Sequence, residues 1–429
     1  MRRIALVLAF TFLLLGICGC KAGSITYDSG TNTITIVGFN ESSPCTFEDI
    51  YQADVANGWG VVSKFGNNVY RFECALQIGD GSTPTYFADT NKIIDIHYTS
   101  GASYSNWYIK SYATATFGKL DDEEEKRTSR GCVFFYSASD SIFRWLGDWG
   151  GNLYLYSTTI YASKTEFWLG RATKRIWNCL FTRRVLVYDC SPDIYRVTVS
   201  ATYIPFSDTA GSLEDVVIYS PNVAIEGWYD SLNNKKFRGI KAIHNVYAVR
   251  MWYFSGNFYL IDSEFDNWKF DWRSSSGKVY RQYTFNLKVM SEGGSPVSDA
   301  KVSVYDKDGN LIFEETTDAN GQIPEKIITR GYYNPSYGST LVDFSPHTLV
   351  IEKEGYETYT MQFTPTEAID WQISLKKAEE QETVGEGIIE VKEERKGKSD
   401  IGEGLVLGLG FGIVLLAIAF FVVKGGGRE

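Results

Sequence analysis

Acidic side chains come nearest to a catalytic pattern in this chain of 429 residues. Asp262, Glu264 and Asp266 stand two residues apart in the stretch DSEFDNWKFDWR, which also supplies Asp271 and Arg273. Glycoside hydrolysis needs two carboxyl groups that face one cleft, and this spacing alone establishes no cleft. A solvated acidic turn accounts for the stretch better, so Asp262, Glu264 and Asp266 are catalytic candidates only for an enzyme alternative.

Tryptophan side chains offer a different chemistry, the non-catalytic binding of sugar rings. Five of them follow the first strand of a predicted repeat at similar offsets: Trp168, Trp228, Trp252, Trp268 and Trp272. Neighbouring residues of a strand point to opposite faces, so a pair such as Phe167 and Trp168 sends one ring inward and the other outward. Outward rings offer sugars an apolar area beside a polar edge. We predict such a ligand-binding ladder, with packing inside the core as the alternative.

Metal and cofactor sites have no recognisable motif in this sequence. The three histidines stand far apart, each near a predicted strand: His97, His244 and His347. The segment DKDGN at residues 306–310 resembles the start of a calcium loop, but it lacks the distal glutamate of an EF-hand and is explained as a hairpin turn. We therefore expect no metal, no catalytic triad and no cofactor.

Two of the seven cysteines, Cys18 and Cys20, lie in or beside the N-terminal apolar segment. The other five leave at least one thiol unpaired: Cys45, Cys74, Cys132, Cys179 and Cys190. Export permits disulfides, so Cys45–Cys74 or Cys179–Cys190 could form. None of the five has zinc-type spacing, and we expect most of them to be small core residues.

A recurring six-residue frame predicts the elements that carry these side chains. The frames LYSTTI, IWNCLF, IYSPNV and LIDSEF begin at residues 155, 176, 218 and 260, so their starts differ by 21, 42 and 42. FYSASD, from Phe135, fits one repeat earlier. A period of 21 with one short strand per repeat is typical of a solenoid, in which each turn advances roughly 5 Å. The polar frame residues should then stack on one wall: Ser157, Asn178, Ser220 and Asp262.

One soluble helix is predicted upstream of the repeats, in CTFEDIYQADVANGW. Thr46 and Asp49 have the spacing of a capping box, and Asn57-Gly58 ends the helix. Its apolar face combines four residues: Phe47, Ile50, Tyr51 and Val55. A solenoid needs its open end covered, so we expect this helix to be the cap. The charged run LDDEEEKR at residues 120–127 is expected to be a solvated loop that interrupts the repeats.

The frame layout and the Asn/Ser ladder resemble the right-handed parallel β-helix family, the pectin-lyase-like fold, over about residues 60–283. The resemblance implies the fold and leaves the function open. The Asp-pair and His-Gly motifs associated with the polygalacturonases of that family are absent. A calcium-ligating acidic set paired with a lyase arginine is absent as well.

A second resemblance begins after Arg281, where strands are predicted at 284–289, 300–305 and 311–315 between Gly, Pro and Asp turns. Residues 284–376 resemble the carboxypeptidase-regulatory-like domain, a small β-sandwich found as a stalk or spacer. The matching positions are Pro296-Val297, Ala300–Val304, Asp308-Gly309, Thr317-Asp318, Gly321 and HTLVIEKEGYETY from His347. The name of that family implies no peptidase activity here.

The N-terminus has the layout of a secretory signal over residues 1–22, with two arginines, an apolar run and then small residues. A retained membrane anchor is the alternative. ICGC also resembles a lipobox that would place a lipid on Cys20. Because the chain is expected to be exported, Asn40 in the tripeptide NES is a candidate glycosylation acceptor.

The C-terminal part predicts a membrane anchor. Residues 377–404 are a charged linker, residues 405–423 lack any charge, and residues 424–429 form a cytoplasmic tail with two cations. A helix of 19 residues spans roughly 28 Å, which matches a bilayer core. Gly404, Gly408 and Gly412 form a small-residue face that could pair two such helices.

Composition agrees with an exported β-protein. Aromatic residues make up 15% of the chain and favour strands, and a net charge of −10 argues against a nucleic-acid partner. We predict an all-β chain: strand and capping helix (23–59), right-handed parallel β-helix (60–283), β-sandwich (284–376) and one transmembrane helix. The predicted function is non-catalytic adhesion or recognition of glycans or partner surfaces at the cell membrane. A surface-anchored polysaccharide lyase or glycoside hydrolase and a viral spike or envelope protein are the alternatives.

Overall fold

The computed structural model describes residues 23–97, 104–131, 133–136, 142–148, 150–162, 166–182, 184–188, 190, 192–200, 204–207 and 212–379. Over these residues the chain is all-β, as predicted, with one α-helix, α2 (Phe47–Asn57), and a short 3-10 helix, η1 (Tyr229–Leu232). The described residues up to Ala378 belong to one compact unit. No helix within the described residues is long and apolar enough to cross a bilayer. The predicted signal peptide and the predicted span at 405–423 lie outside them.

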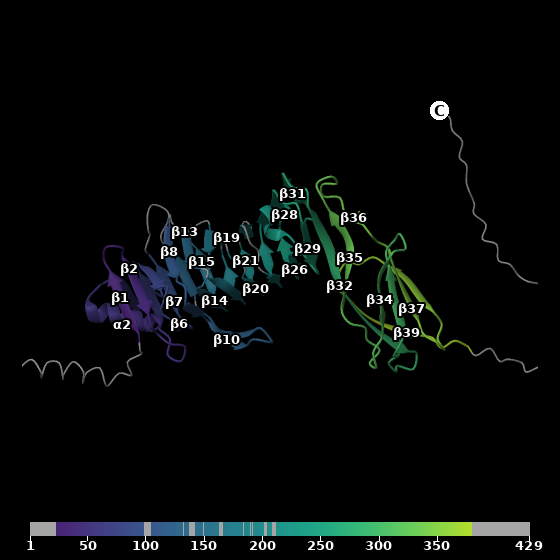
Figure 1. Cartoon of the computed structure of the whole chain (residues 1–429), viewed down its shortest axis with the longest axis horizontal. Coiled ribbons are helices and arrows are strands. Elements are labelled where there is room, and N and C mark those ends of the chain that lie inside the picture. Colours follow the sequence, from purple (N-terminus) through teal and green to yellow (C-terminus); the bar gives the residue numbers. More distant parts are fainter. Residues whose placement is uncertain are drawn as a thin grey trace, which may run out of the picture. The chain divides into compact units, whose positions relative to one another are not determined.

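Three large sheets contain most of the strands (Figure 1). The first sheet has 11 strands: β1 (Ser24–Asp28), β2 (Thr33–Val37), β5 (Ala75–Ile78), β8 (Tyr104–Ile109), β13 (Ile142–Gly147), β16 (Glu166–Leu169), β19 (Arg184–Tyr188), β22 (Ile204–Ser207), β25 (Val223–Trp228), β28 (Tyr247–Trp252) and β31 (Phe270–Arg273). The second sheet has 12: β6 (Thr85–Asp89), β9 (Ala113–Phe117), β14 (Asn152–Tyr156), β17 (Thr173–Trp177), β20 (Asp193–Tyr195), β23 (Ser212–Glu214), β26 (Lys236–Arg238), β29 (Asn257–Ile261), β32 (Lys278–Ser291), β35 (Lys326–Tyr333), β36 (Val342–Asp343) and β39 (Ile369–Leu375). The third sheet has 10: β3 (Val62–Phe65), β4 (Val69–Phe72), β7 (Ile93–Ile96), β12 (Val133–Tyr136), β15 (Thr159–Ala162), β18 (Leu180–Phe181), β21 (Thr198–Ser200), β24 (Val217–Tyr219), β27 (Lys241–Ile243) and β30 (Glu264–Phe265).

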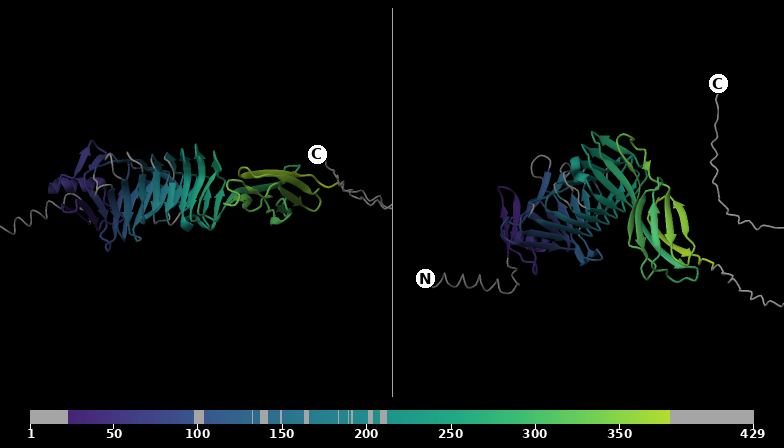
Figure 2. Two further views of the ribbon diagram at one scale, coloured as in Figure 1. Left: turned by 90° about the horizontal axis from the view of Figure 1, so that it is seen from above. Right: turned by 45° about the vertical axis from the view of Figure 1, so that its right-hand side comes forward.

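From β13 to β32 the chain visits the three sheets in a fixed order, first, second and third. Neighbouring strands of a sheet are parallel and three strands apart in the sequence, as β14 and β17 are. One passage through the three sheets is called a coil here, and Figure 2 shows the strands of successive coils side by side. Parallel pairing requires crossover connections of this kind, and here the crossover consists of the other two strands of the coil.

Alternation along each strand places apolar side chains inside the coils. In β14, Leu153 and Leu155 are buried, whereas Asn152 and Tyr154 lie half-buried on the outer face. Leu155 belongs to a column of buried, register-paired residues: Phe117, Leu155, Ile176, Ile194, Leu213, Phe237 and Leu260. Burial of apolar surface contributes about 25 cal/mol per Å², so every added coil extends one continuous core.

The predicted polar ladder is confirmed for Ser157, Asn178 and Asp262. Each follows a strand of the second sheet, and their φ angles are 45°, 56° and 48°. Each donates its backbone N–H to a carbonyl of the next strand of that sheet. Short polar side chains tolerate this left-handed conformation better than bulky ones. The coils between Asn178 and Asp262 fill the same position with Arg196, Asp215 and Gly239.

The ladder prediction is wrong for Ser220 and for the frame at Phe135. Ser220 follows β24 and Phe135 lies in β12, and both strands belong to the third sheet. Successive ladder positions are 18 to 24 residues apart, so the period of 21 is an average over unequal coils. Asn178 and Asp262 fit the period of 21 because they are 84 residues and four coils apart. Ser220 lies 42 residues after Asn178, and this position falls on the third sheet instead of the second.

Helix α2 begins with the predicted capping box of Thr46 and Asp49, and Gly58 ends it in the left-handed conformation. The ring of Phe47 is fully buried among five other rings at the N-terminal end of the coils: Tyr70, Phe72, Phe87, Trp107 and Phe117. Val55 was expected on the same face but is 57% exposed. Asp54 is buried instead, because its carboxylate accepts hydrogen bonds from the backbone N–H groups of residues 60–62.

A second hydrophobic core lies beyond the last coil, in a segment that has the three predicted strands. The sheet β34 (Leu311–Thr316), β33 (Lys301–Tyr305), β37 (His347–Glu352) and β38 (Tyr359–Phe363) contributes to this core together with β32, β35 and β39. Strand β32 belongs to both parts, because residues 278–282 pair with β29 of the last coil and residues 285–291 pair with β39. One continuous strand therefore joins the two cores.

Five of the seven charged residues at 120–127 are exposed, as expected of a solvated run, but the run is not an irregular loop. It forms most of a hairpin that consists of β10 (Lys119–Asp122) and β11 (Arg127–Arg130). The label β10 marks this hairpin in Figure 1. Lys126 at the turn lies 2.5 Å from Glu214 of β23, 88 residues later. Glu123 also pairs with Arg175 of β17, so the hairpin lies against the outer face of the second sheet.

The described cysteines are core residues, as expected. Cys45, Cys74, Cys179 and Cys190 are buried and form no disulfide, so neither of the two pairings considered from the sequence forms. Burial raises the pKa of the Cys179 thiol to about 12. Cys132 and the proposed lipidation site Cys20 lie outside the described residues.

Candidate functional site

Two of the predicted tryptophans form a column on the outer face of the first sheet. Trp228 of β25 pairs in register with Trp252 of β28, and Trp252 pairs with Arg273 of β31. The two indole rings stack with centroids 5.0 Å apart and planes inclined by 12°. The guanidinium of Arg273 lies 5.5 Å from the ring centroid of Trp252, a cation–π contact. Three flat groups from three coils thus form one row.

A parallel column of charges lies two residues before this row. Glu226, Arg250 and Asp271 are paired in register, and the guanidinium of Arg250 donates to Asp271 at 2.8 Å and lies 3.9 Å from Glu226. Glu226 is buried and accepts a hydrogen bond from the indole N–H of Trp252 at 2.8 Å. Burial opposes the charged form of Asp271, but hydrogen bonds from Arg273 and Arg250 outweigh it and lower the pKa of Asp271.

Two tyrosines continue the row beyond the strand ends. Tyr229 and Tyr253 directly follow Trp228 and Trp252, and both have positive φ angles, 52° and 57°. Their rings stack with centroids 5.5 Å apart and remain 57% and 53% exposed. We call this surface the aromatic face; it consists of the two tryptophans and Arg273, the two tyrosines, and the charged column of Glu226, Arg250 and Asp271.

The other predicted tryptophans do not belong to the aromatic face. Trp272 is half-buried against the core and donates its indole N–H to the carbonyl of Gly338. Trp268 lies between β30 and β31, where its ring stacks on Tyr333. The guanidinium of Arg281 lies 4.2 Å from the ring centroid of Trp268. The side chain of Trp168 lies outside the described ones. The outward ladder is thus present for Trp228 and Trp252 and wrong for Trp268 and Trp272.

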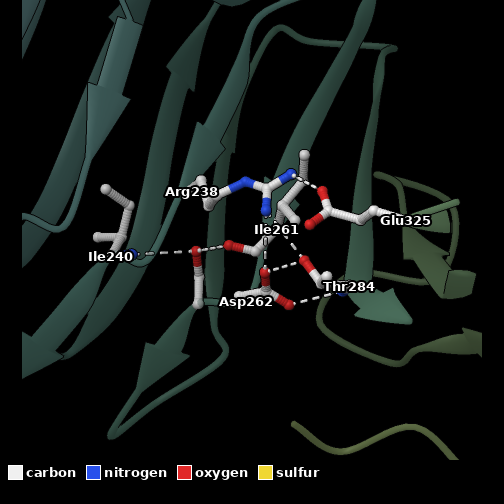
Figure 3. A network of polar contacts seen from close by, with 7 residues as sticks. Arg238, Ile240, Ile261, Asp262, Thr284 and Glu325 are labelled. Atoms are coloured by element: carbon white, nitrogen blue, oxygen red, sulfur yellow. Dashed lines mark hydrogen bonds and ion pairs between the residues drawn. The ribbon is translucent and has the colours of Figure 1, made fainter. Parts of the chain in front are cut away.

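The three candidate carboxylates have separate structural partners. Asp262 accepts hydrogen bonds from the backbone N–H and the hydroxyl of Thr284, and it lies 3.7 Å from Arg238, which also binds Glu325 (Figure 3). Glu264 is exposed and pairs with Lys241 at 3.2 Å.

Asp266 accepts the backbone N–H of His244. Asp262, Glu264 and Trp268 do line one depression of about 370 Å³. Its other lining residues include Tyr283 and Thr366 of the segment beyond the coils, so it is a feature of the junction between the two cores. Because each carboxylate is engaged by its own partner, we do not assign the three a shared catalytic role.

Asn40, the candidate glycosylation acceptor, is exposed in a turn. Its side-chain oxygen accepts hydrogen bonds from the backbone N–H of Ser43 and the hydroxyl of Ser42. The exposure leaves room for a modification, although the amide takes part in the turn. Within the described part of the chain, no group of three His, Cys, Asp or Glu side chains is placed to hold a metal ion.

A depression on the second sheet was missed by the sequence analysis. It measures about 280 Å³ and is lined mainly by the outer faces of β6, β9, β14 and β17, with Tyr86, Tyr154, Tyr156 and Arg175 among its residues. Tyr154 and Tyr156 alternate with buried leucines in the stretch NLYLY, and this alternation is the sequence signal that marks both rings as outward. Among the described residues that line it, Glu41 is the one carboxylate.

Comparison with known proteins gives no relative that carries function over to this chain. No protein-family model matches the sequence, and a search of curated proteins found no match. Among solved structures, a 3-chlorocatechol 1,2-dioxygenase from Rhodococcus opacus 1CP matches 23% of this chain and 60% of its own length, with 19% identity and a TM-score of 0.17. The Bacillus anthracis TIE protein matches 25% of this chain and 20% of its own length, with 15% identity and a TM-score of 0.18. Both scores are too low to support a statement about fold or function.

Proposed function

We propose that the coils form a right-handed parallel β-helix and that this part of the chain recognises glycans at the cell surface without catalysis. The parallel sheets, each built from every third strand, support the β-helix. Crossover connections between parallel strands are right-handed in about 98% of cases, which gives the handedness. In this proposal the β-sandwich is the stalk and residues 405–423 are the membrane anchor.

The aromatic face is the observation that carries the proposed function. Tyr229 and Tyr253 leave more than half of their surface exposed beside Trp228 and Trp252. Aromatic rings supply apolar area with polar edges, and charged groups beside them can bind hydroxyls. Stacking occupies one face of each ring, and the guanidinium of Arg273 also lies against the ring of Trp252, so a sugar would contact the two tyrosines and the exposed ring edges. We place the glycan over the two tyrosines, which are the most exposed members of the row.

The charges of the aromatic face favour binding over hydrolysis. A glycosidase needs a general acid that holds its proton near neutral pH, and such a carboxyl has a raised pKa. The pKa of Asp271 is lowered by Arg273 and Arg250, so this carboxylate suits hydrogen bonding to a ligand and not proton donation. The enzyme alternative therefore finds no general acid in Asp271.

Glycan binding by the full-length chain in detergent tests the proposal, first on a glycan array and then by calorimetry with the best-bound oligosaccharide. Tyr253→Ala should lower the affinity roughly tenfold, since one aromatic anchor contributes on the order of 1–2 kcal/mol. Tyr219→Ala is the matched control, because Tyr219 is 43% exposed but lies in β24 of the third sheet. Absence of glycan binding, or equal losses in both variants, would overturn the proposal. Release of shortened oligosaccharides would support the enzyme alternative instead.

A further inference from the structure

The hairpin β10–β11, here called the strap, is attached to the second sheet without being part of it. Its two strands pair with each other and with no other described strand. The strap starts after β9, and Lys126 at its turn reaches Glu214 at the end of β23, with β14, β17 and β20 lying between these two strands in the sheet. Four strand spacings correspond to roughly 19 Å. The strap therefore lies across several coils.

Side-chain contacts hold the strap down along this length. Thr128 and Ser157 share a hydrogen bond between their hydroxyls, and the amide of Asn178 donates to the Thr128 hydroxyl at 2.9 Å. Near the turn, Glu123 pairs with Arg175, and the ammonium of Lys126 also lies 4.3 Å from the ring centroid of Tyr195. Glu123 keeps 62% of its side chain exposed, and such surface pairs hold the strap only weakly.

The strap covers a second aromatic column, here called the seat, which consists of Tyr156, Trp177 and Tyr195. These residues are paired in register on β14, β17 and β20, and their strand neighbours Leu155 and Ile176 point inward, so the seat points outward. The three rings are nevertheless only 4%, 3% and 8% exposed. They form a hydrophobic cluster of their own, separate from the interior core, with Leu120 of the strap packed against it. Because outward rings with such low exposure must be covered by another segment, and because Leu120 and Lys126 contact them, the strap is that cover.

A polar column accompanies the seat, as it does on the aromatic face. This column lies two residues before the seat on each strand, and two residues before the last residue of β23. Its register-paired members are Tyr154, Arg175, Asp193 and Ser212. The open depression of about 280 Å³ begins at Tyr154, Tyr156 and Arg175 and adds the hydroxyls of Thr114 and Thr116. The depression and the seat therefore belong to one continuous surface. The strap covers the seat and leaves the depression open.

We propose that the strap is a gate over a second glycan-binding groove, which extends from the depression along the seat once the strap lifts. The inference takes its ligand class, a linear neutral oligosaccharide, from the proposed function, but it concerns a different sheet. Rows of aromatic and polar groups along the coil axis suit a linear chain that offers apolar ring faces and hydroxyls at every unit. A two-stranded hairpin is marginally stable by itself, so the strap can open while the sheets stay folded.

The gate makes the apparent affinity depend on the open fraction. A ligand that binds only the open form has an apparent Kd equal to its intrinsic Kd divided by the fraction of molecules that are open. Glu123→Ala together with Lys126→Ala removes the charge pairs near the turn and should raise the open fraction roughly tenfold, because both pairs favour the closed form. Adding Trp177→Ala should abolish the gain by removing the middle ring of the seat.

A reversible lock provides the decisive comparison. Thr128→Cys with Ser157→Cys places two thiols where two hydroxyls are now in contact, so oxidation should fasten the strap and reduction should free it. Binding of cellohexaose, xylohexaose and chitohexaose is measured by calorimetry on the full-length chain, in the Tyr253→Ala background, which weakens binding at the aromatic face roughly tenfold. At least one hexasaccharide should bind the reduced form at least tenfold more tightly than the oxidised form. Equal affinities in both forms, or no binding of any of the three to the reduced form, would overturn the proposal.

Hydrogen exchange tests the opening independently of any sugar. Backbone amides of residues 119–130 should exchange faster than those of β14, β17 and β20, and oxidation of the lock should slow them. If the strap exchanges only together with these strands, it does not open as a unit and the gate is wrong. Because the lock acts on the strap alone and Tyr253→Ala on the aromatic face alone, either proposal can fail while the other stands.

Discussion

Trp228 and Trp252 stack with ring centroids 5.0 Å apart although 24 residues separate them in the chain. The distance is the spacing between neighbouring parallel strands, since both residues end strands that are paired in register. One complete coil of the chain returns it to the neighbouring position of the same sheet, and this brings the two rings together. The same geometry brings Glu226 to the indole N–H of Trp252 and Arg273 to its ring.

The tryptophan pair should be energetically coupled. Trp252→Ala removes the stacking partner of Trp228 and the donor to the buried carboxylate of Glu226, and we expect it to lower the free energy of unfolding by about 2 kcal/mol. Trp252→Phe keeps an aromatic ring without the donor and should cost less. In a double-mutant cycle with Trp228→Ala, measured by denaturant unfolding, the coupling should be about 0.5–1.5 kcal/mol. Strict additivity of the two alanine variants would contradict the stack.

Acid should weaken the N-terminal cap through Glu48 of helix α2. Burial opposes its charged form, but hydrogen bonds from Lys64 and Tyr70 outweigh this and lower the pKa of Glu48 from 4.5 to about 2. A carboxyl with a lowered folded-state pKa stabilises the fold above its unfolded pKa, and this stability is lost as the pH falls from about 4.5 towards 2. Thermal unfolding followed by circular dichroism should show this loss in the parent and a flatter profile in Glu48→Gln. Identical profiles would exclude this role of Glu48.

The polar network at Asp262 should stabilise the last coil where it meets the second core. Asp262→Ala leaves the buried backbone N–H of Thr284 without its acceptor and places alanine at a φ of 48°, so we expect a loss of about 2–3 kcal/mol in unfolding free energy. Asp262→Asn keeps an acceptor and tolerates the left-handed conformation, and its loss should be about half as large. Equal losses in chemical unfolding would show that neither the acceptor nor the backbone conformation decides the stability there.

The buried thiols should be chemically inert in the folded chain. Burial raises the pKa of the Cys179 thiol to about 12, well above neutral pH, and the thiolate is the reactive form. Alkylation followed by peptide mass spectrometry should label Cys45, Cys74, Cys179 and Cys190 only after unfolding in guanidinium. Rapid labelling of Cys179 under native conditions would contradict its burial.

Truncation after Lys376 should yield a folded protein that is released from the membrane. The cut keeps the ion pair of Lys376 with Glu357 at 2.8 Å and the hydrogen bond from the Glu357 N–H to the Lys376 carbonyl, and it removes the bond from the Ala378 N–H to the Gly355 carbonyl, so the Tm should stay close to that of the full-length chain. Fractionation and circular dichroism of the truncated and full-length chains measure the two effects. If the truncated chain still sediments with membranes, a retained N-terminal helix or a lipid on Cys20 is the anchor instead.

The sequence by itself determined the local features of the fold. Alternation in NLYLY assigned Leu153 and Leu155 to the interior, and the capping box of Thr46 and Asp49 gave the start of helix α2, because these signals depend on residues a few positions apart. The ladder at Ser157, Asn178 and Asp262 was also found, since a left-handed turn after each strand favours short polar side chains.

Only the tertiary structure decided which distant residues meet. The coils differ in length by several residues, so a fixed period could not place Ser220 on the correct sheet. The charged run at 120–127 likewise gave no indication that Lys126 would pair with Glu214. Trp228 and Trp272 have similar local patterns, yet one ring faces outward and the other is held by Gly338, a residue from beyond the coils. Register between coils and the docking of later segments depend on contacts across tens of residues, and no local pattern of side chains encodes them.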